Sequence, residues 1–207
     1  MKNAIIFDYD GVIIDSYEIF IDHFIEACKI QGFPQIAGEE EFLKLYEKNM
    51  YKSMFEMGMT KDQILKIVLY MKKQLIKNQY KIRLFPNIYE TIKKLSQKNY
   101  LFIVTSNETT VVKKYLESKN IDFITEILGS DIEPSKIKKI KSIKTKYVAD
   151  NYYYIGDTSG DILEGKKAKV KTIAVSWGWF DKKRLEKTNP DFLIQKPKDL
   201  LKIIPNI

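Results

Sequence analysis

Cysteine and histidine each occur once in this chain of 207 residues, and their scarcity excludes two kinds of site. Cys28 has no second cysteine with which to form an internal disulfide, which suits a reducing compartment. We interpret it as a small apolar residue on a helix. His23 has no second histidine beside it, so we interpret it as a helix-face residue. A fold stabilised by internal disulfides and a metal centre built from histidine and cysteine ligands are therefore excluded.

Arginine is scarce although the chain is basic. Lysine supplies 33 of the 35 basic residues, and the exceptions are Arg83 and Arg184. The net charge of +8 at pH 7 alone would suit a nucleic-acid partner. Base and phosphate recognition usually depends on the planar fork of arginine, so we interpret most lysines as solvated surface and expect no nucleic-acid partner. A nucleic-acid end phosphatase stays an alternative, which requires one basic stripe leading into the site.

Long apolar runs are also lacking, since no segment approaches the length of about 20 residues that spans a bilayer. The apolar residues 4–7 are too few for the core of a secretion signal. The composition, 44% hydrophobic and 30% charged, is that of an ordinary globular protein with one domain, or a domain with a sizeable insertion. We therefore expect a cytoplasmic monomer or homodimer with no membrane contact.

The short apolar run at residues 4–7 is followed at once by Asp8, Asp10 and Gly11. Such a run, bounded by a turn residue, predicts a buried parallel strand, whose carboxyl end is where open α/β sheets bind ligands. Two carboxylates at one strand end repel each other. Such a pair is therefore unfavourable unless a cation or a reaction requires it. Taken alone, the motif has a second interpretation as an ordinary Asp-Gly turn.

Residues 17–80 show helical patterns and no strand pattern. Asp15 or Ser16 is the expected N-cap of the first helix. The last helix opens with Thr60-Lys61-Asp62-Gln63, which has the pattern of a capping box. Apolar spacing predicts helices over residues 17–31, 39–47 and 60–76. We therefore predict an all-helical block inserted directly after the first strand.

Strand and helix patterns alternate beyond residue 80. Strands are predicted over residues 100–104, 152–155, 172–175 and 192–194, with helical patterns between them. This alternation is typical of an α/β fold with a doubly wound, Rossmann-like parallel sheet. We predict that residues 1–16 and 81–207 form this α/β domain and that residues 17–80 form the helical insertion.

Small polar or acidic residues stand at the ends of the main strands. After the first pair come Thr105 and Asp157, and Asp161 shares a helix face with Asp157 if that turn is helical. Several carboxylates around one pocket, without cysteine or histidine, form an oxygen-ligand site that suits Mg²⁺. Asp157 alone could be an ordinary turn residue, and Asp161 alone could be an N-cap. These interpretations do not explain why both acids occur together with Asp8 and Asp10.

The order and spacing of four motifs resemble the haloacid dehalogenase-like hydrolase superfamily across nearly the whole chain. The motifs are Asp8-Tyr9-Asp10-Gly11-Val12, Thr105, a lysine within residues 135–141, and Gly156-Asp157-Thr158-Ser159-Gly160-Asp161. Residues 172–179, followed by Asn189-Pro190-Asp191, resemble the phosphoglycolate phosphatase-type branch. In that branch a helical cap follows the first motif, where this chain has residues 17–80.

The resemblance implies a role for each acid. Asp8 would be the nucleophile that attacks phosphorus and forms an aspartyl-phosphate. Asp10 would protonate the leaving alcohol and then activate water, and its backbone carbonyl would ligate Mg²⁺. Asp8 and Asp157 would be metal ligands, while Asp161 would bind the metal through water or hold the lysine. The dehalogenase branch lacks an acid at the position of Asp10, so its presence favours phosphoryl transfer.

The resemblance also implies a phosphate-binding set. Thr105, with Ser106 and Asn107 after it, would contact the phosphoryl group or the substrate, and a lysine would neutralise the charge that develops there. Close relatives often have a Lys-Pro pair at the third motif, which this chain lacks. We choose Lys136, in the first turn of the predicted helix, and Lys139 on the same face stays the alternative.

These assignments predict a Mg²⁺-dependent phosphatase of a small phosphomonoester, similar to phosphoglycolate phosphatase. A sugar phosphomutase of the same superfamily and a non-catalytic binding module that retains the fold stay alternatives. Substrate choice in this branch lies in the cap, where Asn49, Tyr51 and Lys52 are expected between two helices, within reach of an anionic leaving group. Packing for Tyr51 and solvent exposure for Lys52 are equally compatible with the sequence.

Overall fold

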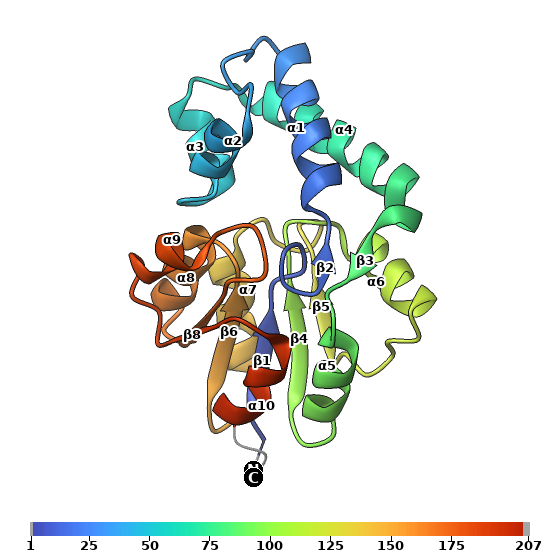
Figure 1. Cartoon of the computed structure of the whole chain (residues 1–207), viewed down its shortest axis with the longest axis vertical. Helices are drawn as coiled ribbons and strands as arrows, with labels where there is room; N and C mark the ends of the chain where they lie inside the picture. The colour runs from blue at the N-terminus through green and yellow to red at the C-terminus, as the bar shows by residue number, and fades with distance from the viewer. Residues whose placement is uncertain (1, 205–207) are drawn as a thin grey trace.

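The computed structural model describes residues 2–204 and places a layer of helices above a six-stranded parallel sheet (Figure 1). Every strand pair in this sheet is parallel. In spatial order the strands are β5 (Glu126–Leu128), β4 (Tyr100–Val104), β1 (Ala4–Phe7), β6 (Tyr152–Gly156), β7 (Lys171–Val175) and β8 (Phe192–Ile194). The chain runs from β1 to one edge and later from β6 to the other, which confirms the predicted doubly wound sheet. Its switch point lies between β1 and β6.

The central strand β1 is apolar throughout because both of its faces are covered. Its four residues are fully buried. Ile5 and Phe7 belong to one core cluster, while Ala4 and Ile6 belong to another on the opposite face. A strand buried on both sides cannot show the alternation of a half-exposed strand, which is why it reads as a continuous apolar run.

Helices cover both faces of the sheet. The core cluster of Ile5 and Phe7 includes side chains of α5 (Ile88–Ser96), α6 (Thr109–Ser118) and α10 (Leu200–Ile203). On the other face lie α7 (Lys136–Lys146) and α8 (Ser159–Lys167), which pack against each other. The shorter elements are α9 (Lys182–Glu186), η1 (Gln79–Lys81) and η2 (Pro197–Asp199).

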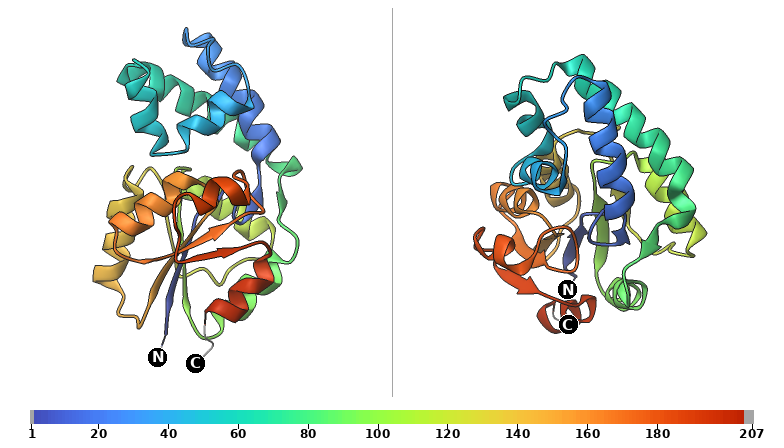
Figure 2. Two further views of the ribbon diagram at one scale, coloured as in Figure 1. Left: turned by 60° about the vertical axis from the view of Figure 1, so that its left-hand side comes forward. Right: turned by 45° about the horizontal axis from the view of Figure 1, so that its top comes forward.

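The helical block forms its own layer above the carboxyl ends of the strands (Figures 1 and 2). It consists of α1 (Tyr17–Ile30), α2 (Glu39–Leu45), α3 (Met50–Glu56) and α4 (Lys61–Asn78). Phe24 and Cys28 of α1 share a buried cluster with Ile67 and Met71 of α4. The predicted capping box begins α4, since the Thr60 backbone N–H donates to the side chain of Gln63 and the Thr60 hydroxyl accepts from the Gln63 backbone N–H. None of the helices within residues 2–204 has the length and apolar character needed to cross a membrane.

Several short elements differ from the sequence-based prediction. Helix α3 was not predicted, and it places Tyr51 and Lys52 on a helix with Asn49 as its N-cap, instead of between two helices. The two chain segments that enter and leave the helical layer pair as short antiparallel strands, β2 (Ile14–Asp15) and β3 (Arg83–Leu84). Two-residue strands and a helix of seven residues, such as α3, are too short to show a clear periodic pattern.

Candidate active site

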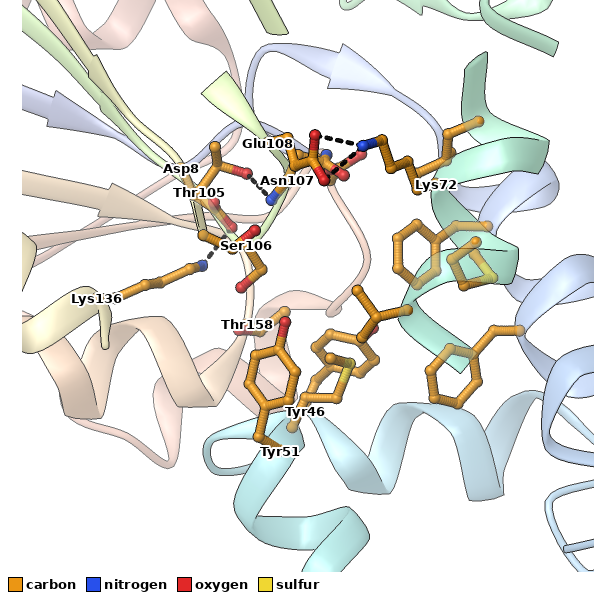
Figure 3. Close-up of a pocket in the computed structure, with 18 of the residues that line it drawn as sticks. Asp8, Tyr46, Tyr51, Lys72, Thr105, Ser106, Asn107, Glu108, Lys136 and Thr158 are labelled. Atoms are coloured by element: carbon orange, nitrogen blue, oxygen red, sulfur yellow. Dashed lines mark hydrogen bonds and ion pairs between the residues drawn. The ribbon is translucent and has the colours of Figure 1, made fainter. Parts of the chain in front are cut away.

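The eight residues that the sequence analysis chose for catalysis, phosphate binding and metal binding all line one pocket between the sheet and the helical layer. Figure 3 labels Asp8, Thr105, Ser106, Asn107 and Lys136 among them. The pocket brings together residues from three strand ends and two helix starts. They are Asp8, Asp10, Thr105, Ser106, Asn107, Lys136, Asp157 and Asp161. The carboxyl ends of adjacent parallel strands meet at one edge of a sheet, which explains why residues so distant in sequence converge here.

Lys136 links two of the acids. Its Nζ lies 2.9 Å from Asp8 Oδ2 and 2.7 Å from Asp161 Oδ1, and all three side chains are buried. Burial raises the pKa of Asp8 to about 7, although Lys136 opposes this rise. Lys136 stays charged because the two carboxylates raise its pKa well above the ordinary value, in spite of its burial. The start of α7 thus delivers a fixed positive charge to the end of β1.

Asp157 has one carboxylate oxygen without a hydrogen-bond partner among the described residues. Its Oδ2 accepts the backbone N–H of Trp179 at 2.7 Å, but the buried Oδ1 is unpaired. Burial, together with the charges of Asp161 and Asp8, raises the pKa of Asp157 well above its usual range. One oxygen each from Asp8, Asp157 and Asp161 lie within 4.8 Å of one another. An unpaired buried carboxylate oxygen in an all-oxygen group fits a hard divalent cation such as Mg²⁺.

Glycine on two sides allows the Asp157 carboxylate to occupy this position. Gly11 has a φ of +75°, and a Cβ there would lie 1.9 Å from Asp157 Oδ2. A Cβ at Gly178 would lie 2.4 Å from the same oxygen. Any side chain at either position would displace the carboxylate.

Asp161 uses both of its oxygens within the protein. Oδ1 accepts from Lys136 and from the Tyr154 hydroxyl at 2.9 Å, and Oδ2 accepts from the Thr158 hydroxyl at 2.6 Å. Burial opposes the ionisation of Asp161, but Lys136 and these hydrogen bonds outweigh it and lower the pKa. This arrangement favours holding the lysine, one of the two roles implied by the resemblance, over direct ligation of a metal.

Asp10 is held by two hydrogen-bond donors on the other side of the pocket. Its Oδ1 accepts from the Ser16 hydroxyl at 2.6 Å, and its Oδ2 accepts from Asn107 Nδ2 at 2.5 Å. Burial raises the pKa of Asp10 to about 6, against the effect of these two donors. Ser16 is the N-cap residue of α1, one of the two residues expected there, but its hydroxyl makes no capping bond and donates to Asp10 instead.

The two candidate lysines of α7 occupy different environments. Lys139 is 1% exposed, and its Nζ donates to the backbone carbonyls of Thr105 at 2.6 Å and Gly129 at 3.3 Å. Burial lowers the pKa of Lys139 to about 8. Lys139 therefore holds the backbone beneath Thr105, whereas Lys136 faces the carboxylates.

The helical layer contacts the sheet domain through the loop between α2 and α3. The Tyr46 carbonyl accepts the backbone N–H of Gly160 at 2.9 Å, and Asn49 Nδ2 donates to Glu164 Oε1 at 2.8 Å. Tyr51 lines the pocket, whereas Lys52 is 69% exposed and pairs with Glu56 outside it. The sequence pointed to Asn49 and Tyr51 but missed Glu164, because a helix-face glutamate carries no signal of a partner 115 residues away.

Comparison with known proteins identifies the family. Residues 5–175 match the family model described as haloacid dehalogenase-like hydrolase. The chain belongs to this family. It is 26% identical over 214 aligned residues to the pyrophosphatase PpaX of Bacillus cereus strain B4264, and the match covers 99% of this chain and 97% of the relative.

Solved structures give the same result. A haloacid dehalogenase-like family hydrolase from Streptococcus pneumoniae superposes with a TM-score of 0.79 at 27% identity, covering 99% of each chain. A protein from Haemophilus somnus described as a predicted phosphoglycolate phosphatase superposes with a TM-score of 0.76 at 21% identity, over 99% of this chain and 98% of that one. The second likeness is one of fold alone.

Proposed function

We propose that this chain is a Mg²⁺-dependent phosphatase that hydrolyses a small phosphomonoester through an aspartyl-phosphate on Asp8. The unpaired Asp157 oxygen next to Asp8 carries the proposal, because it provides a cation site directly beside the nucleophile. The similarity to hydrolases and to a pyrophosphatase supports it. In this proposal residues 17–80 act as a cap over a core made of residues 1–16 and 81–207.

Asp8, Asp157 and the backbone carbonyl of Asp10 would hold the Mg²⁺. The ion supplies positive charge that lets the anionic phosphoryl group approach the Asp8 carboxylate. In the first step an Asp8 oxygen forms a bond to phosphorus while the bond from phosphorus to the leaving oxygen breaks. Lys136 Nζ and the Thr105 hydroxyl neutralise and orient the transferring phosphoryl oxygens.

Asp10 moves the protons. It gives its proton to the leaving oxygen in the first step, and as a carboxylate it then takes a proton from water. That water attacks phosphorus, the bond between Asp8 and phosphorus breaks, and inorganic phosphate is released. A pKa of about 6 permits both roles near neutral pH. Ser16 and Asn107 hold the carboxyl group in place between the two steps.

The two alternatives have less support. A phosphomutase must retain and reorient a sugar phosphate, which needs unpaired basic groups on the cap side of the pocket. The cap-side cation that lines the pocket within the described chain is Lys72, and it is paired with Glu108. A non-catalytic module would not require Asp10, Lys136 and Asp157 around Asp8. This pocket holds all four residues.

A phosphate-release screen across phosphomonoesters, with and without Mg²⁺, tests the proposal. We expect release that requires Mg²⁺ and falls at least about 10³-fold in Asp8→Asn, because the amide is a far weaker nucleophile. Asp22→Asn, an equivalent change of charge on a surface helix, is the matched control. Equal release by Asp8→Asn and the wild type, or no release from any substrate, would contradict the assignment.

A further inference from the structure

Beyond the reacting residues, most side chains on the cap side of the pocket are apolar, and the exceptions among the described residues are Tyr46, Tyr51 and Lys72. Figure 3 labels Lys136 on one side of the pocket and Lys72 of α4 on the other, and apolar side chains line the cap side. Helices α1 and α4 supply them at helical spacing, so that one face of each helix lines the cavity. They are Phe20, Phe24, Ile67, Val68, Met71 and Leu75. When the phosphoryl group of a bound substrate lies next to Asp8, the leaving group attached to it would lie against this apolar wall.

Both cations that line the pocket within residues 2–204 are neutralised by carboxylates. Lys72 Nζ lies 2.6 Å from each oxygen of Glu108, in a bridge from α4 to the start of α6 (Figure 3). Lys136 is shared between Asp8 and Asp161. A second negative charge on the substrate would therefore meet no unpaired positive partner in the pocket. Moving an ion out of water without such a partner is unfavourable.

Two other cap lysines lie near the pocket, and each is paired with a carboxylate of the cap. Lys48 and Lys52 both lie more than half exposed, with their Nζ atoms 3.8 Å and 3.6 Å from the carboxylate of Glu56. Neither lines the cavity that contains Asp8, although Lys48 lines a smaller cavity that adjoins it at Ser106 and Lys136. On the cap side, the described residues that line the cavity around Asp8 are therefore apolar side chains, two tyrosines and Lys72, which is paired with Glu108.

We infer that the leaving group of the substrate is uncharged and apolar, an aryl or alkyl alcohol. The substrate would then differ from phosphoglycolate and pyrophosphate, whose leaving groups carry a second anion. This inference rests on the proposed phosphatase function and specifies its substrate class. Contact with the wall formed by α1 and α4 favours apolar substituents, and the paired state of Lys72 disfavours anionic ones.

Two matched substrates test the inference. Benzyl phosphate and 4-carboxybenzyl phosphate share the ring and the scissile oxygen, and they differ only by a charge at the far end. We expect kcat/KM with Mg²⁺ to be at least about 10-fold higher for benzyl phosphate. The variant Glu108→Gln frees the charge of Lys72, so the ratio of the two kcat/KM values should fall. Glu108 makes no side-chain capping bond, so α6 keeps its start.

The outcomes separate this inference from the function on which it rests. If 4-carboxybenzyl phosphate is hydrolysed as well as benzyl phosphate or better, the inference is wrong and the phosphatase function stands. An unchanged ratio in Glu108→Gln would also contradict the role given to the Lys72 pair. If neither substrate, nor any other phosphomonoester, releases phosphate in a reaction that depends on Mg²⁺ and Asp8, both proposals fail.

Discussion

Substitution of Gly160 by alanine should keep the cap from closing while the fold stays intact. A Cβ at this position would lie 2.3 Å from the carbonyl oxygen of Lys48 and 3.0 Å from that of Tyr46. Ordinary contacts of a Cβ begin near 3.4 Å, so the loop between α2 and α3 must retreat by about 1 Å. That retreat stretches the hydrogen bond from Gly160 N–H to Tyr46 and the one from Asn49 to Glu164.

The magnitude follows from these two hydrogen bonds. Each contributes roughly 0.5–1.5 kcal/mol, so the closed arrangement loses about 1–3 kcal/mol relative to an open one. If chemistry requires closure, kcat/KM should fall by about 5- to 150-fold. The folded state itself should not suffer, because alanine is the better helix former and Gly160 lies in the first turn of α8.

The assay is kcat/KM for Mg²⁺-dependent phosphate release, with thermal unfolding measured on the same samples. Ser159→Ala changes the preceding residue of α8 without adding an atom toward the loop, and it is the matched control. Asn49→Ala removes one of the two hydrogen bonds by another route and should give a smaller loss in the same direction. An unchanged kcat/KM in Gly160→Ala at an unchanged Tm would refute the reasoning that this loop closes onto α8.

Three further perturbations test separate parts of the site. Asp10→Asn should lower kcat by about 10²- to 10⁴-fold for alkyl phosphates with little change in KM, and an unchanged kcat would remove Asp10 from the proton transfers. Asp157→Asn should raise the Mg²⁺ concentration for half-maximal activity by roughly 10-fold or more, because one ligand charge is lost; equal Mg²⁺ titrations would contradict its role as a ligand. Burial lowers the pKa of Lys139 to about 8, so between this pH and the unfolded value of about 10.4 the unfolded chain binds more protons and stability rises with pH. Denaturant unfolding across this pH window should show the free energy of unfolding of the wild type rising by up to about 3 kcal/mol relative to that of Lys139→Met. If the free energies of the two proteins instead change in parallel with pH, the lowered pKa of the buried Lys139 is contradicted.

The convergence of the site was predictable from sequence because it depends on a general property of parallel sheets. A buried strand followed at once by Asp8, Thr105 or Asp157 places that residue at the carboxyl edge, whatever the details of packing. The sequence favoured Lys136 because it lies in the first turn of the helix, but Lys139 stayed an alternative, since both lie on one helix face. Only the packing of α7 shows that one faces the carboxylates and the other the carbonyl of Thr105.

Contacts that join distant segments through single side chains could not be predicted. Ser16 has the sequence context of an N-cap, and its hydrogen bond to Asp10 depends on how the turn after β1 folds back. The pair of Lys72 and Glu108 joins α4 to the start of α6, and each residue alone reads as solvated surface. The second contact neutralises the cap lysine that lines the pocket, so the substrate preference could be inferred only from the structure.

The phosphoryl group on Asp8 is the central claim, and 4-nitrophenyl phosphate with the Asp10→Asn variant tests it most directly. Nitrophenolate is a good leaving group that needs no proton, whereas hydrolysis of the aspartyl-phosphate still requires the missing base. We predict a Mg²⁺-dependent burst of about one nitrophenolate per enzyme molecule. After acid quench, mass spectrometry should find one phosphoryl group on the peptide that contains Asp8. Phosphate release without a burst, or a phosphoryl group on another residue, would contradict the account.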